Sequence, residues 1–143
     1  MSIDLSWDAL PPGIHNGAIH EIDFKFGATV SIVITYRVPH AGVDYFVSEW
    51  LTIDAPRTSG TYNATAEGKG RLKQLCEAHR LPLPTKLKPA EIIATLTGKE
   101  FRLGVSTRQV NGLPVPKVAA ILGKANKPVR PQSTDLPDEE ERV

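Results

Sequence analysis

The sequence lacks the features that mark disulfide-bonded, zinc-binding and membrane-spanning chains. Cys76 is the single cysteine, which excludes an intrachain disulfide and the common multi-cysteine zinc sites. No uninterrupted apolar run approaches the length that crosses a bilayer, and residues 1–12 lack the basic and apolar regions of a secretory leader. We therefore expect a cytoplasmic protein without a membrane partner.

Catalytic and cofactor-binding constellations are also missing. The four histidines stand in unrelated contexts, and His79 shares an apolar helical stripe with Cys76, so we expect both to be core or boundary residues. Residues 67–71 place glycines around a lysine but lack the G-x-x-x-x-G-K-[ST] order of a phosphate-binding loop. We predict no catalytic residue, no metal site and no cofactor, and hence a protein that is not an enzyme.

The net charge of +1 hides an uneven distribution of charged residues. Residues 1–56 carry two bases against seven acids, residues 57–130 carry fourteen bases against four acids, and residues 131–143 carry five acids against one base. The length suits one small domain, which we place at 1–130, and the last segment offers too little to bury and is predicted to be a disordered acidic tail. The tail either covers the cationic surface when no polyanion is bound or only aids solubility.

Hydrophobic periodicity predicts five strands and two helices. Alternating apolar residues indicate three meandering strands; the first has Ile14, Ala18, Ile22, Phe24 and Phe26 on its apolar face. Residues 55–70 look like a long connection. After it, apolar residues that recur at intervals of three and four residues predict a helix. Asn111-Gly112 favours a tight hairpin turn between the last two strands. The expected strands are 14–26, 29–38, 43–53, 100–107 and 115–122, and the expected helices are 69–80 and 89–97.

This order of elements predicts the fold class. Three strands, a helix and a two-strand hairpin follow one another as in the OB-fold, a five-stranded Greek-key barrel. We therefore expect a mainly β protein with one or two short helices. A half-open α+β sheet of the same strands would give the same pattern.

Two aromatic residues lie on the polar face of the third expected strand. The odd positions of that strand carry the apolar series, so Phe46 and Trp50 face the other way, about 13 Å apart at ~3.3 Å per residue. Arg37, on the polar face of the second strand, is their expected cationic neighbour. Such a surface suits unpaired nucleobases, which stack on aromatic rings. The alternative is that both rings pack under the long connection or in a subunit interface.

Basic residues near the expected loops complete the candidate site, because cations follow the phosphates of a nucleic acid. We expect Tyr62, in the long connection, to be a further stacking residue. The basic candidates are Arg57, Lys69, Arg71, Lys73, Arg108 and Lys117.

Several short segments resemble one known family. They are LPPG (10–13), SEWLTI (48–53), GRLKQLC (70–76), EII (91–93) and GKEF (98–101). Together they are similar to segments of bacteriophage and prophage single-stranded DNA-binding proteins with an OB-fold. The resemblance implies sequence-independent binding of single-stranded DNA during phage DNA replication or recombination, in the cytoplasm of a bacterial host. Residues 135–143 resemble the acidic tails that recruit replication and repair proteins, although a terminal aromatic is missing and Arg142 interrupts the acids.

A second function remains open at this point. The same strands could form an OB-like protein-interaction or assembly module that binds no nucleic acid, with Phe46 and Trp50 in a subunit interface. The sequence also leaves open a homo-oligomer and the choice between DNA and RNA.

Overall fold

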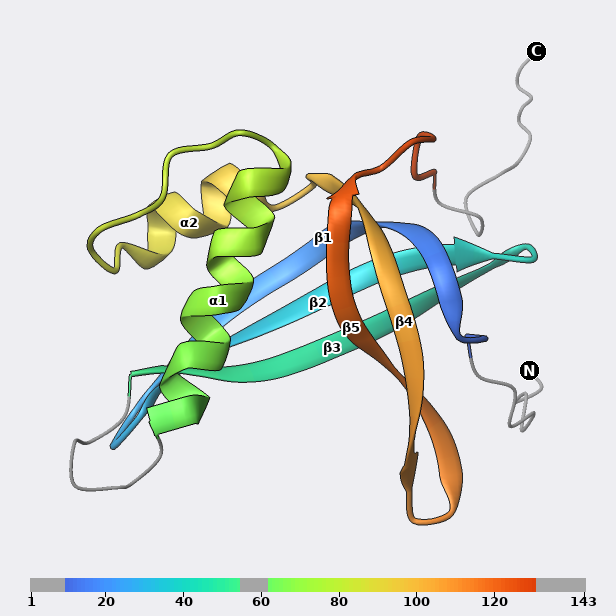
Figure 1. Cartoon of the computed structure of the whole chain (residues 1–143), viewed down its shortest axis with the longest axis horizontal. Helices are drawn as coiled ribbons and strands as arrows, with labels where there is room; N and C mark the ends of the chain where they lie inside the picture. Colours follow the sequence, from blue (N-terminus) through green and yellow to red (C-terminus); the bar gives the residue numbers. More distant parts are fainter. Residues whose placement is uncertain (1–9, 55–61, 131–143) are drawn as a thin grey trace, which may run out of the picture.

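The computed structural model describes residues 10–54 and 62–130 and shows a mainly β protein (Figure 1). The expected strands are confirmed, each within three residues at either end. Among the described residues, no helix is both long and apolar enough to cross a membrane. In chain order the elements are β1 (Gly13–Phe26), β2 (Val30–His40), β3 (Val43–Asp54), α1 (Tyr62–Ala78), α2 (Pro89–Leu96), β4 (Glu100–Val110) and β5 (Leu113–Lys124).

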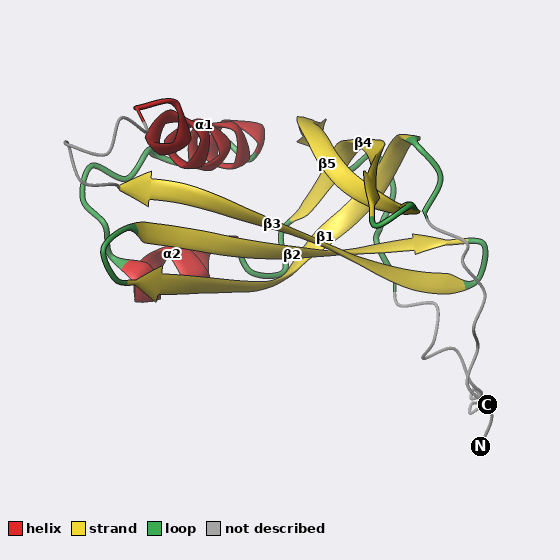
Figure 2. Ribbon diagram, turned by 90° about the horizontal axis from the view of Figure 1, so that it is seen from below, coloured by secondary structure: helices red, strands yellow, loops and turns green. Residues whose placement is uncertain are grey.

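The five strands form one open antiparallel sheet in the order β3-β2-β1-β4-β5. The strands β3 and β5 are the two edges, yet residues of the two come within 8 Å of each other because the sheet curves strongly. Both views place the helices toward one end of the long axis and the β2–β3 turn at the other, with β4 and β5 between them (Figures 1 and 2). The β3 edge therefore lies near both α1 and β5.

Two tight turns each connect the strands of a hairpin, one between β2 and β3 and one between β4 and β5. Asn111 and Gly112 both adopt positive φ values, 52° and 81°, which confirms the turn expected from this dipeptide. Ala41 and Gly42 adopt nearly the same pair, 53° and 81°, between β2 and β3. Such turns match the right-handed twist of paired strands, so each hairpin keeps its register up to the turn.

The expectation that Ile14 and Phe26 lie on the buried apolar face of β1 is wrong, because both are exposed. The pairing of β1 with β2 shifts between Ile19 and Glu21, so an extra residue bulges out and the alternation changes phase. Before the bulge the inward positions are odd, and Ile14 is therefore exposed while Ile19 is buried. Phe26 is exposed because it lies at the strand end, where its ring stacks on Phe24.

The expected connection over residues 55–70 is also wrong in its second half. Helix α1 begins at Tyr62, and Glu67 to Arg71 lie inside it, so Tyr62 is a helical residue. The glycine at 68 is buried against β3: a β-carbon there would lie 2.9 Å from the Thr52 carbonyl carbon and closer still to its oxygen. A close helix–strand contact, not a loop, explains this glycine. The helix ends at Ala78, before Arg80 turns to a φ of 53°.

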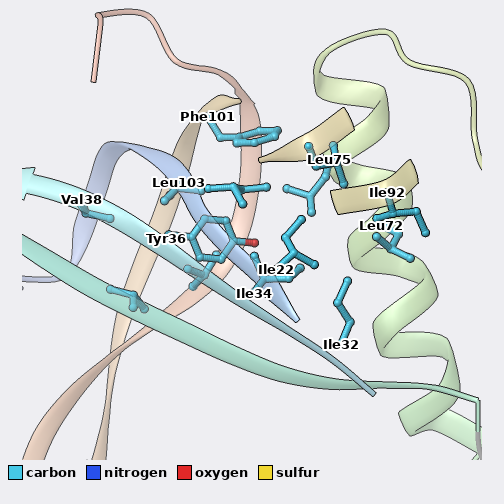
Figure 3. Packing of buried hydrophobic residues seen from close by; sticks show 14 of the residues in the cluster. Ile22, Ile32, Ile34, Tyr36, Val38, Leu72, Leu75, Ile92, Phe101 and Leu103 are labelled. Carbon is cyan, nitrogen blue, oxygen red and sulfur yellow. The ribbon is translucent and has the colours of Figure 1, made fainter. Parts of the chain in front are cut away.

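The core lies between the curved sheet and the two helices (Figure 3). Ile32, Ile34, Tyr36 and Val38 stand at alternate positions of β2 and are fully buried. The expected roles of Cys76 and His79 are confirmed. Cys76 is buried, which raises the pKa of its thiol, while the His79 ring packs edge-on against Phe101 and its Nε2 lies 2.7 Å from the Glu100 carbonyl oxygen.

Two glycines of α1 test the helix–strand contact. Alanine normally stabilises a helix by about 0.5–1 kcal/mol relative to glycine. We expect this gain for Gly70→Ala, whose new methyl group meets nothing within 4 Å. Gly68→Ala should instead destabilise the protein by about 1–3 kcal/mol, because the β3 backbone must move. Urea denaturation of both variants measures whether each substitution raises or lowers the free energy of unfolding. A higher free energy of unfolding in Gly68→Ala would contradict the close contact between α1 and β3.

Candidate nucleic-acid interface

A groove of about 660 Å³ separates β3 and α1 from the β4–β5 hairpin. We call it the β3–α1 groove. Ser48 and Trp50 line it from β3, Glu67, Arg71 and Gln74 from α1, and Ser106, Arg108 and Lys117 from the hairpin. Four of the sequence-predicted site residues, Trp50, Arg71, Arg108 and Lys117, therefore meet in one place.

The Trp50 side chain is the most exposed apolar group of the groove. It is 66% exposed, as expected from the alternation along β3, where Val47 and Ile53 point into the core. No ring contact is recorded for Trp50 within residues 10–54 and 62–130. Its ring is thus available to a flat ligand.

The hairpin wall opposite Trp50 carries positive charge. Ser106 and Lys117 are directly paired across β4 and β5, and Arg108 lies two residues from Ser106, so the three share one face of the hairpin. Arg108 and Lys117 are exposed, and neither has an ion-pair partner in the described part of the chain. Both cations can therefore reach an anionic ligand in the groove.

The floor of the groove is a buried ionic network around Glu49. Its carboxylate accepts a hydrogen bond from the Tyr36 hydroxyl at 2.6 Å and pairs with the Arg71 guanidinium at 3.0 Å. Arg71 also donates to the Val118 carbonyl oxygen at 3.2 Å and to Gln74. The side chains of Glu49 and Arg71 are only 8% and 12% exposed. One carboxylate thus connects β2, β3 and α1, and Arg71 extends the connection to β5.

Arg71 is one of the basic residues expected at the site, but this network occupies its guanidinium. The guanidinium is held by protein groups on several sides, which gives Arg71 a structural role in the groove wall. Sequence reasoning missed its partner, Glu49. The signal was present, because Glu49 stands between Val47 and Leu51 on the apolar face of its strand, and a carboxylate there requires a buried cation or donor.

Phe46 and Arg37 lie outside the β3–α1 groove. Phe46 is 54% exposed and its ring meets His20 edge-on, with the ring centroids 5.0 Å apart. Arg37 pairs with Phe46 in the strand register, but its guanidinium lies 3.8 Å from Asp44 and 3.5 Å from the Val129 carbonyl oxygen. Phe46 is therefore a second exposed ring on the same strand face, whereas Arg37 is largely covered by protein.

The remaining candidates are distributed differently from the expectation. Lys69 and Lys73 are exposed on the other side of α1, where they line a second hollow. Arg57 lies outside the described residues, as does the side chain of Tyr62. The acidic segment 131–143 is also outside them. The groove thus unites only part of the predicted set.

Comparison of the sequence with protein-family models found no match, and comparison with curated proteins found no relative. Within the described residues, no group of three histidine, cysteine or acidic side chains could hold a metal ion. The function is therefore inferred from the geometry of the groove.

The Glu49–Arg71 pair predicts a large asymmetry between single and double variants. Arg71→Met leaves the Glu49 carboxylate buried without its cation, which should lower the free energy of unfolding by about 3 kcal/mol. The double variant Glu49→Gln/Arg71→Met removes both charges and should recover much of this loss. Urea unfolding of the two single variants and the double variant gives the coupling energy, and purely additive losses would contradict a direct pair.

Tyr36 predicts a loss of stability at alkaline pH. Burial, followed by the nearby Glu49 charge, raises the pKa of Tyr36 well above its ordinary value of 10.0. The unfolded chain releases the phenolic proton above pH 10 while the folded protein keeps it, so this contribution to stability is complete below pH 10 and falls as the pH rises further. Tyr36→Phe should be less stable than the parent at neutral pH, and the difference should shrink above pH 10. A difference that stays constant with pH would contradict this account.

Proposed function

We propose that this protein binds single-stranded DNA without marked sequence preference and that the β3–α1 groove is its principal binding site. The observation that carries the proposal is Trp50, an exposed ring in the same groove as Arg108 and Lys117, two cations without an ion-pair partner among the described residues. Unpaired bases stack on such a ring whatever their identity, and the cations neutralise phosphates. The role in phage replication or recombination implied by the sequence resemblance belongs to the same proposal.

The topology supports the finer assignment of an OB-fold barrel. The sheet order β3-β2-β1-β4-β5 brings the edges β3 and β5 within 8 Å of each other, and α1 lies in the chain between β3 and β4. We propose that these two edges close a five-stranded barrel of the OB type. Barrels of this type bind oligonucleotides over the outer face of strands 2 and 3 and the adjoining loops, which is where Trp50 and Phe46 lie.

The bound strand would extend along β3 beyond the groove. Phe46 lies four residues from Trp50 on the same face, about 13 Å away at ~3.3 Å per residue. That separation suits two platforms for separate bases. Thr35 and Ser48, whose hydroxyl oxygens are 2.9 Å apart, lie between the platforms on the same strand face. They would offer hydrogen bonds to bases or phosphates along this path.

Substitution of Trp50 tests the stacking platform. Trp50→Ala should weaken binding of a short fluorescein-labelled oligothymidine roughly 5- to 150-fold, which is the ~1–3 kcal/mol of one stacked base. Fluorescence anisotropy measures the affinity, and a urea unfolding curve shows that the fold is retained. Phe46→Ala is the matched variant on the same strand face, and its loss reports whether the strand continues along β3.

Substitution of the hairpin cations tests the phosphate contacts. Affinity falls as salt rises, and Arg108→Gln and Lys117→Gln should each make the slope of log affinity against log salt less steep by about 0.7, the value for one phosphate contact on a single strand. Lys124→Gln, an exposed cation that does not line the groove, is the control. An unchanged slope in both groove variants would contradict the proposed path. If the parent protein binds no single-stranded DNA and Trp50→Ala changes the oligomeric state, the results would instead favour the protein-interaction module.

A further inference from the structure

A second surface lies on the other side of α1. Two adjoining hollows of about 610 and 320 Å³ open between α1, residues 81–88 and α2. We call them together the α1–α2 hollow. Both are lined by Leu72, Leu83 and Ile92, and Leu83 and Leu87 are 46% and 39% exposed. Exposed leucines over a hollow of this size indicate a surface that binds apolar side chains.

The rim of the larger hollow is positive, whereas the smaller one is also lined by Lys88 and Glu91, which pair with each other. Lys69, Lys73 and Lys86 line the larger hollow, and none of the three has an ion-pair partner among the residues that the structure describes. The lining of both hollows contains no aromatic side chain, so it offers no stacking platform to a nucleobase. Aliphatic side chains beside unpaired lysines suit an acidic peptide that also carries aliphatic residues.

The chain itself contains such a peptide. Residues 131–143 carry five acids against one base, and Leu136 and Val143 are its aliphatic side chains. We propose that this segment docks in the α1–α2 hollow of the same molecule, with its acids on the three lysines and Leu136 against Leu83 and Leu87. This proposal goes beyond DNA binding, because it concerns another face of α1.

Covalent attachment makes docking within one molecule favourable. The segment follows Arg130 directly, so Leu136, six residues further along the chain, can lie up to about 20–22 Å from Arg130 when the segment is extended. The acids at 138–141 follow Leu136 and can reach further. A tethered segment experiences an effective concentration in the millimolar range, so a weak contact suffices. Docking there would leave the β3–α1 groove open to DNA.

Zero-length cross-linking of the full chain tests the proposal. A water-soluble carbodiimide joins a lysine amine to a carboxylate in direct contact, and peptide mass spectrometry identifies the joined pair. At low protein concentration we expect links from Lys69, Lys73 or Lys86 to the acids at 135–141, within monomers. Links to Lys117 would place the segment in the β3–α1 groove and overturn the proposal. Links only between copies, or none at all, would overturn it as well.

Two variants separate specific docking from general attraction between opposite charges. Leu136→Ser keeps every acid but removes the aliphatic anchor, and the links to the three lysines should be lost or strongly reduced. Leu83→Ser removes the facing side chain on the hollow and should have the same effect. Ser133→Ala is the control within the segment and should leave the links unchanged. Undiminished links in Leu136→Ser would show that charge alone holds the segment and would overturn the proposal. A urea unfolding curve of Leu83→Ser shows whether that variant is folded, so that a loss of links in it can be assigned to the missing side chain.

Discussion

The Glu49 carboxylate is the constraint on which the arrangement of the groove depends. It points inward from an edge strand, where a charge without a partner would strongly favour the unfolded chain. Arg71 supplies the compensating charge from α1, Tyr36 supplies a hydroxyl from β2, and Arg71 also reaches the Val118 carbonyl of β5. Satisfying one charge thus brings the helix and both sheet edges together, and the groove is the space left between them.

The parts of the fold that follow from local pattern could be predicted. Strict alternation defines β2 and the outward position of Trp50, and Asn111-Gly112 defines a hairpin turn. The bulge of β1 could not be predicted, because apolar residues stand at both Ile14 and Ile19 and either phase satisfies the pattern. The start of α1 was hidden for another reason. Glycine has a low helix propensity, and only its contact with β3 explains why residue 68 is a glycine inside a helix.

The candidate site shows the same division between local pattern and three-dimensional packing. The basic character of residues 57–130 is visible in the sequence, but the direction of each cation depends on helix geometry. Lys69 and Lys73 are four residues apart and share one side of α1, whereas Arg71 lies about 200° around the helix from Lys69 at ~100° per residue. The three therefore cannot serve one surface. Arg71 meets Glu49, while the two lysines face the second hollow.

Helix α1 consequently separates two cationic surfaces of different chemistry. One combines an exposed indole ring with Arg108 and Lys117, and the other combines exposed leucines with Lys69, Lys73 and Lys86. Positive charge attracts any polyanion to either surface, so charge alone does not assign a ligand to each. The apolar groups make the distinction, because flat rings stack with bases and branched aliphatic side chains pack with one another. A chain with a net charge of only +1 can therefore present two cationic surfaces, provided that its acids and bases are kept apart in space.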